Sequence, residues 1–167
     1  MRNAPLDHIR QSPSDRGRLE LIVVDHTAET GGALDVAHGL VGERRRSGDR
    51  QLTIMNARVI ELVAGAKDRW PVAGDQLFVD LDLSTTNLPA GTHLQIGSAI
   101  VEVTPPPHRG CEKFGARFGR EALDLVNSSE GIELNLRGIH AKVVQGGTVH
   151  VGDTVNKVLQ DAMRRPT

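Results

Sequence analysis

Short apolar runs, some of them alternating with polar residues, recur along the chain and predict β-strands. Residues 19–26 (LELIVVDH) are rich in Val and Ile, which favours a buried strand over a helix. Residues 51–56 (QLTIMN) predict a second strand. Residues 76–83 (QLFVDLDL) alternate with period two, as expected of a half-buried strand. The apolar pattern therefore indicates a sheet.

Two further segments predict β-hairpins. In residues 92–104 (THLQIGSAIVEVT), an Ile-Gly-Ser sequence separates two alternating runs. In residues 138–155 (GIHAKVVQGGTVHVGDTV), Gly146 and Gly147 take that place. Glycine suits such turns because it adopts positive φ angles without steric cost. Each segment is therefore expected to fold back on itself as an antiparallel pair.

Helical signals are fewer. Asn56 stands where it can cap a short helix at residues 57–64, and Gly65 follows as a stop signal. A longer helix is expected over residues 114–127, where the apolar residues fall on one face. Two glycines weaken this helix, each by roughly 1 kcal/mol relative to alanine.

The remaining segments are richer in glycine and charge. Residues 26–51 contain five glycines and a basic run, which predicts loops with at most short regular pieces. Residues 1–17 predict a mobile tail and residues 159–167 a C-terminal tail, flanking a single domain at residues 18–158. Many short strands with one or two short helices indicate a mainly β fold (β-rich α+β). A barrel-like arrangement is expected because it closes the edges of the sheet.

Composition and charge narrow the functional classes. The 167 residues carry 20 basic and 21 acidic side chains, so no overall field favours nucleic acid or membrane surfaces. With three Phe, one Trp and no Tyr, the chain lacks stacking platforms for single-stranded nucleic acid. We find no signal peptide and no apolar run of membrane-spanning length. A cytoplasmic location is expected, where the single cysteine stays reduced.

That cysteine, Cys111, lies in the segment PPPHRGCEKFG and is surrounded by His108, Arg109 and Lys113. It directly precedes a predicted helix, whose free amide donors and cationic neighbours lower the pKa of a thiol. A thiolate can attack an electrophile, carry a persulfide or bind a soft metal. The alternative is an inert buried cysteine, but the polar flanking residues favour a reactive or ligating one.

Other kinds of site have weaker signals. His108 and Cys111 have H-x-x-C spacing, and His93 and His140 are the histidines that would complete a zinc set. Arginines suit anionic groups, and Arg137, which precedes a glycine and a strand, is one candidate anion contact. The chain has no P-loop and no G-x-S-x-G hydrolase elbow.

Five stretches in order along the chain resemble the MOSC domain, named for the C-terminal domain of molybdenum cofactor sulfurases, and in particular its small stand-alone bacterial members. These stretches are residues 38–45 (HGLVGERR), 50–65, 88–104 (LPAGTHLQIGSAIVEVT), 107–119 (PHRGCEKFGARFG) and 136–153. The fourth contains the characteristic cysteine of the family. The resemblance implies a β-rich, barrel-like fold and a site built on Cys111, which either binds the molybdenum of the pterin cofactor or relays sulfur.

The resemblance also implies contacts for that cofactor. The basic positions that hold its phosphate and pterin fall on Arg44, Arg50 and Arg137. Asn87 matches the family's Arg-x-Asn-Leu run, but the sequence here is STTNLP, so the preceding arginines are absent. The 167 residues leave no room for the pyridoxal-phosphate desulfurase domain of the full-length sulfurases, so this chain alone is not expected to bind pyridoxal phosphate.

Three active functions remain open. In the first, Cys111 is a metal ligand or sulfur relay for a molybdenum–pterin cofactor, with Arg109, Lys113 and His140 among the contacts. A partner protein would then supply sulfur or electrons. In the second, the protein is a molybdenum-independent cysteine enzyme acting on a sulfur-containing or electrophilic small molecule, with His108 or His140 as general base. In the third, it is a non-catalytic carrier of the cofactor.

Overall fold

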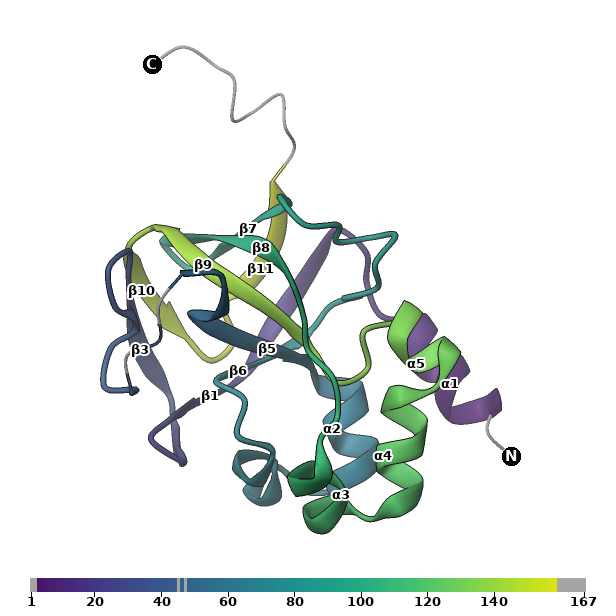
Figure 1. The fold of residues 1–167 in the computed structure, drawn as a ribbon. Coiled ribbons are helices and arrows are strands. Elements are labelled where there is room, and N and C mark those ends of the chain that lie inside the picture. Colours follow the sequence, from purple (N-terminus) through teal and green to yellow (C-terminus); the bar gives the residue numbers. More distant parts are fainter. Residues whose placement is uncertain (1–2, 45, 47, 159–167) are drawn as a thin grey trace.

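Seven strands close into a β-barrel in the computed structural model, which describes residues 3–44, 46 and 48–158 (Figure 1). In order around the barrel they are β11 (Thr154–Val158), β7 (His93–Ile96), β8 (Ala99–Pro107), β9 (Ile139–Gln145), β5 (Leu52–Asn56), β6 (Leu77–Asp80) and β1 (Arg16–Val24). Pairing of β1 with β11 closes the ring. Strands β5 and β6 run parallel, and the other neighbouring strands are antiparallel. The expected β-rich, barrel-like class is confirmed.

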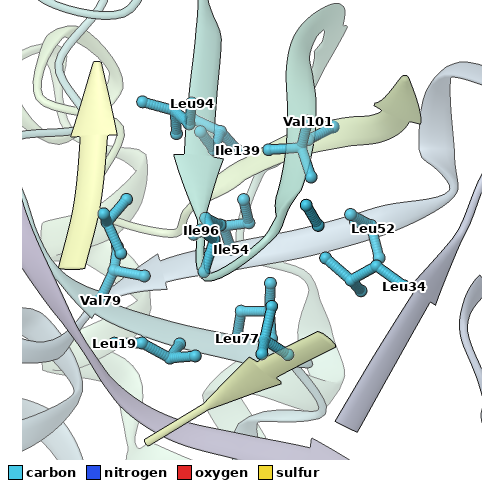
Figure 2. Packing of buried hydrophobic residues seen from close by; sticks show 14 of the residues in the cluster. Leu19, Leu34, Leu52, Ile54, Leu77, Val79, Leu94, Ile96, Val101 and Ile139 are labelled. Carbon is cyan, nitrogen blue, oxygen red and sulfur yellow. The ribbon is translucent and has the colours of Figure 1, made fainter. Parts of the chain in front are cut away.

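Aliphatic side chains fill the barrel (Figure 2). Leu52 and Ile54 of β5 are two residues apart, so both point inward, where they pack with residues such as Leu77 and Val101 of other strands. Each fully buried side chain of this kind contributes roughly 1.5–3 kcal/mol relative to an exposed one. The cluster inside the barrel contains no aromatic ring among the described residues.

Short helices cover one side of the barrel, and they outnumber the one or two expected. They are α1 (Asn3–Arg10), α2 (Ala57–Ala64), α3 (Glu112–Phe118), α4 (Arg120–Asn127) and α5 (Ser129–Glu133), with 3-10 helix η2 at Lys67–Ala73. Beneath them lies a second core that includes Met55, Trp70, Phe78 and Phe114. Met55 and Phe78 alternate with interior residues along β5 and β6, so these strands supply both cores.

Helix α2 has the ends that the sequence predicts. The backbone N–H of Arg58 donates to Oδ1 of Asn56 at 2.8 Å, and the helix ends at Gly65, where φ is +80°. None of the helices in residues 3–44, 46 and 48–158 has the length and apolar character needed to span a membrane.

Two helical features differ from the expectations. Residues 3–10, within the segment expected to be a mobile tail, form α1 because Leu6 and Ile9 share one face and are buried in the second core. The single helix expected at residues 114–127 is divided into α3 and α4 at Gly119, which has φ +99° and ψ 164°. Only glycine adopts this conformation readily, so the residue that was expected to weaken the helix breaks it. Residues 159–167, the predicted C-terminal tail, lie outside the described part of the chain.

One of the two predicted hairpins forms. Strands β7 and β8 pair with each other around a turn at Gly97, as expected. The prediction for residues 138–155 is wrong, because β9 pairs with β8 and β5, whereas the next strand joins another sheet. That second sheet consists of β10 (Gly147–His150), β3 (Gly31–Asp35) and β4 (Gly39–Leu40).

Residues 26–51 otherwise match their expectation of loops with short regular pieces. Besides β3 and β4 they contain β2 (Thr27–Glu29), which pairs with β1, and the 3-10 turn η1 (Gly48–Arg50). The side chain of Thr104 on β8 donates to the carbonyl of Asp49, and this bond anchors η1 to the barrel. Residue Arg50 is thereby held beside the strands that carry the candidate site.

Candidate functional site

Cys111 lies between the end of β8 and the start of α3. Pro107 still pairs with Ile139 of β9, and four residues later Cys111 is the N-cap residue of α3. The side chain is exposed, and the thiol makes no capping hydrogen bond. The amide of Phe114, then that of Lys113 and the charge of Arg137, hold the pKa of the thiol below its ordinary value. The sequence-based expectation of a thiol in a setting that favours its anion therefore agrees with the geometry.

Behind the cysteine lies a buried ion pair. Nη1 of Arg137 donates to Oδ2 of Asp75 at 2.6 Å, and Nη2 donates to the carbonyl of Ala73 at 3.2 Å. The Asp75 side chain is 1% exposed and that of Arg137 is 10% exposed. The guanidinium also lies 4.9 Å from the ring centroid of Phe114, the residue whose amide faces the sulfur. Both Nη atoms of Arg137 are thus bonded within the protein, although the sequence suggested a contact with an external anion.

His108 and His140 stack beside this ion pair, with ring centroids 4.7 Å apart. Burial lowers the pKa of His108 to about 4, and the Asp75 carboxylate, 3.9 Å from Nδ1, offsets the effect only in part. Burial also lowers the pKa of His140, and the charge of Arg50 adds to the effect. Both imidazoles are therefore neutral at pH 7.

Three buried nitrogen atoms in this cluster have no hydrogen-bond partner among the described residues. They are Nδ1 of His108, Nδ1 of His140 and Nε of Arg137. Buried polar atoms are nearly always paired with protein or water, so a cluster of three indicates a polar region with hydrogen-bonding capacity to spare.

Arginines of the segment before β5 act on the histidine pair through their charge. The charges of Arg46 and Arg50 both disfavour protonation of His140, and that of Arg46 also acts on His108. Arg44 is exposed, and its neighbour Arg45 lies outside the described residues. The structure therefore brings the charge of Arg50 to bear on the cluster, whereas Arg44 is a solvent-exposed side chain of the same segment.

A groove of about 290 Å³ opens next to His108. Its walls come from the proline segment of β8, from the loop before β7 and from the segment that precedes β9. Polar groups on it include Arg109, Asn135 and Thr85. The groove is large enough for part of a small molecule.

Asn87 and Lys113, both predicted to contact the cofactor, have different surroundings. Asn87 donates to the carbonyls of Ser14 and Asp82 at 2.8 and 2.7 Å, and its Oδ1 accepts from Lys157 at 3.0 Å. Both polar atoms of its side chain are hydrogen-bonded within the protein, so Asn87 stabilises the loop before β7. The side chain of Lys113 is exposed, and only its backbone amide acts on the cysteine.

The zinc set considered from the sequence does not form. His93 lies on β7, where its Nε2 is 3.0 Å from Oε1 of Glu102 on β8. Throughout residues 3–44, 46 and 48–158, no three His, Cys, Asp or Glu side chains are grouped so as to hold a metal ion. The H-x-x-C spacing of His108 and Cys111 is therefore not part of a four-ligand site.

Asp75, the acidic partner of the cluster, was not predicted from the sequence. It follows Gly74, which ends η2 in the left-handed region, and lies two residues before the start of β6 at Leu77. The only feature of the sequence that could have identified it is an acidic residue close to the start of a buried strand. Its importance comes from Arg137, 62 residues later in the chain.

The profile of the MOSC domain family matches residues 42–156, which include β5, the whole cysteine segment and β9. MOSC domains are associated with molybdenum cofactor binding. The sequence matches none of the curated proteins compared with it.

Solved structures with the same fold include YuaD from Bacillus subtilis and YiiM from Escherichia coli, each with a TM-score of 0.61. YuaD is 16% identical, with 84% of this chain and 94% of that chain covered. YiiM from Escherichia coli is 17% identical, with 86% and 70% covered. YiiM from Geobacillus stearothermophilus is 16% identical, with a TM-score of 0.53 and 87% and 74% covered. By the match of its sequence over most of the domain, the chain belongs to the MOSC domain family.

Proposed function

We propose that this protein binds a molybdenum–pterin cofactor through the Cys111 thiolate or relays sulfur to it. The observation that carries the proposal is the environment of the Cys111 thiol, which is open to solvent and close to backbone amides. Its sulfur is exposed, and the amides of Phe114 and Lys113 favour its anionic form. In its anionic form the sulfur can serve as a ligand to a metal ion.

The residues present fit such a group. Because the pterin part of the cofactor would itself hold the metal, Cys111 would be the thiolate that this chain contributes, and a set of several protein ligands would not be needed. Arg50, whose charge acts on His140, and Arg109, which lines the groove with His108, are exposed cations that would hold anionic parts of the cofactor. Arg44 is a further exposed cation of the same segment. When bound, the cofactor would supply redox chemistry at the metal.

The two histidines would act as neutral hydrogen-bonding groups rather than as strong bases. With a pKa of about 4, His108 is a weak proton acceptor at pH 7. The unpaired Nδ1 atoms of His108 and His140 leave each ring able to orient a bound molecule or a water molecule. If sulfur is relayed, the Cys111 thiolate would attack the outer sulfur of a persulfide on a partner protein, release the partner's thiolate and carry the sulfur as a Cys111 persulfide.

A second candidate is a molybdenum-independent cysteine enzyme for sulfur-containing or electrophilic small molecules. Thr85, exposed on the groove wall where the family has arginine, favours it, because fewer cations then face an anionic cofactor. A non-catalytic carrier differs from both candidates, because it would still bind the cofactor after replacement of Cys111.

Elemental analysis for molybdenum and zinc tests the proposal. The wild-type protein, from a host that makes the cofactor, is compared with Cys111→Ala and with the control His93→Ala, whose side chain pairs with Glu102 on another part of the barrel. We expect stoichiometric molybdenum in the wild type and the control, and loss in Cys111→Ala. Molybdenum retained by Cys111→Ala would support the carrier. Protein that contains no molybdenum and takes up no cofactor in vitro would reject the proposal and favour the metal-free enzyme.

A further inference from the structure

We infer that helix α4 positions the Cys111 loop, and that Asn127 at the end of this helix is the positioning residue. The inference rests on the proposed function only in assigning a use to the thiol. The structural evidence for it concerns the backbone of Gly110, the residue that immediately precedes the cysteine.

The side chain of Asn127 binds both polar backbone groups of Gly110. The N–H of Gly110 donates to Oδ1 of Asn127 at 2.9 Å, and Nδ2 of Asn127 donates to the carbonyl of Gly110 at 2.9 Å. A carboxamide carries one acceptor and one donor side by side, so it can satisfy both groups at once. The paired bonds fix the orientation of residue 110, and with it the direction in which the chain reaches Cys111.

Close packing holds the same segment against α4. A Cβ atom on Gly110 would lie 2.7 Å from Cγ2 of Val126 and 2.9 Å from Cδ1 of Leu123. A Cβ atom on Gly115, in α3, would lie 2.9 Å from Cδ2 of Leu123. Glycines on both sides of Cys111 therefore allow α4 to approach the loop and the following helix more closely than any other residue would permit.

Helix α4 is itself fixed to the second core, so it can hold the Cys111 loop in one position. Val126 is 1% exposed and Ala122 is 9% exposed, both in the second core. Beyond Asn127, the hydroxyl of Ser128 donates to the carbonyl of Leu125 at 2.7 Å and accepts from the N–H of Gly131 at 3.0 Å. Asn127 thus projects from a helix end whose backbone is held on both sides.

The test compares Asn127→Ala and Asn127→Asp with the wild type. The aspartate keeps the acceptor for Gly110 but, when ionised, loses the donor. Asp124→Ala is the matched control, because Asp124 lies on the same helix and makes a surface ion pair with Arg120 at 3.1 Å. Fluorescence of the single tryptophan verifies that each variant is folded.

Two local measurements decide the inference. Hydrogen exchange of the peptide that spans Gly110 and Cys111 should accelerate about tenfold in Asn127→Ala, because a local opening then breaks fewer bonds. Alkylation of Cys111 by iodoacetamide is measured up to the high-pH plateau, where the thiol of every variant is fully ionised. The plateau rate should rise about threefold as the sulfur leaves the amides that hold it. We expect Asn127→Asp to lie between the wild type and Asn127→Ala, and Asp124→Ala to match the wild type.

Unchanged exchange and unchanged plateau rates in folded Asn127→Ala would overturn the inference, whatever the metal content. Changes of equal size in Asp124→Ala would also overturn it, because the effect would then belong to helix stability in general. Molybdenum content separates the inference from the proposed function. If the wild type binds no molybdenum, the proposed function fails, and exchange and alkylation still decide the role of Asn127. If the wild type binds molybdenum, Asn127→Ala should contain less per folded molecule.

Discussion

Replacement of Arg137 by methionine should destabilise the protein strongly. The change leaves the Asp75 carboxylate, which is 1% exposed, without its 2.6 Å partner in a buried setting. Removing one member of a buried ion pair typically costs about 3–5 kcal/mol. The lost contact with the Phe114 ring adds a smaller amount. For a chain of this length, such a loss lowers the melting temperature by roughly 10 °C.

Chemical denaturation followed by tryptophan fluorescence measures this effect directly. The single tryptophan, Trp70, is 3% exposed in the core that Arg137 borders, with its ring 5.6 Å from that of Phe78. The double variant Asp75→Asn, Arg137→Met removes both charges and should recover at least about 1 kcal/mol relative to Arg137→Met alone. A cost below about 1 kcal/mol for Arg137→Met would refute the reasoning. Arg137 would then be free for the cofactor contact that the sequence suggested.

Three further predictions concern other parts of the site. Because burial lowers the pKa of His108 from 6.5 to about 4, the unfolded chain binds the proton more readily. The contribution of His108 to the free energy of unfolding should therefore fall by about 3 kcal/mol as the pH drops from 6.5 to 4, and His108→Gln should reduce the pH dependence of the unfolding free energy measured by denaturation. Gly138→Ala places a Cβ 2.6 Å from the carbonyl of Ile54 at φ +125°, and should cost more than about 2 kcal/mol. The control Gly91→Ala, with φ +94° and open space around it, should melt closer to wild type. Asn87→Ala should lose about 1–3 kcal/mol of stability, because its hydrogen bonds to the loop are removed. It should still contain as much molybdenum per folded molecule as the wild type. A loss of metal without a loss of stability would instead support the predicted role of Asn87 as a cofactor contact.

The sequence was informative wherever the determining interactions are local. The Asn56 cap and the Gly65 stop of α2 depend on bonds within a few residues, and both were predicted. Period-two alternation identified the β7–β8 hairpin, because the strands are joined by a turn at Gly97. The chemistry of Cys111 was also readable, since the amides that act on its sulfur belong to the two residues that follow Glu112.

Expectations failed where the partner of a segment is distant in the chain. Strands β9 and β10 are adjacent in sequence and separated by a glycine turn, yet β10 pairs with β3, more than 100 residues earlier. An alternating pattern specifies which face of a strand is buried but not which strand lies beside it. The short apolar face of α1 likewise becomes a helix only because the second core is there to cover it.

The sequence by itself therefore determined a β-rich chain, a single exposed thiol in a setting that favours its anion, and the resemblance that names the family. Only the tertiary structure decided how the residues around that thiol are used. It turns Arg137 inward to Asp75, ties Asn87 to its own loop, and places Asn127 on the peptide before Cys111. The physical reason is that a polar side chain commits to whichever buried partner folding brings within hydrogen-bond distance. That choice is made by contacts between distant elements, which no local pattern contains.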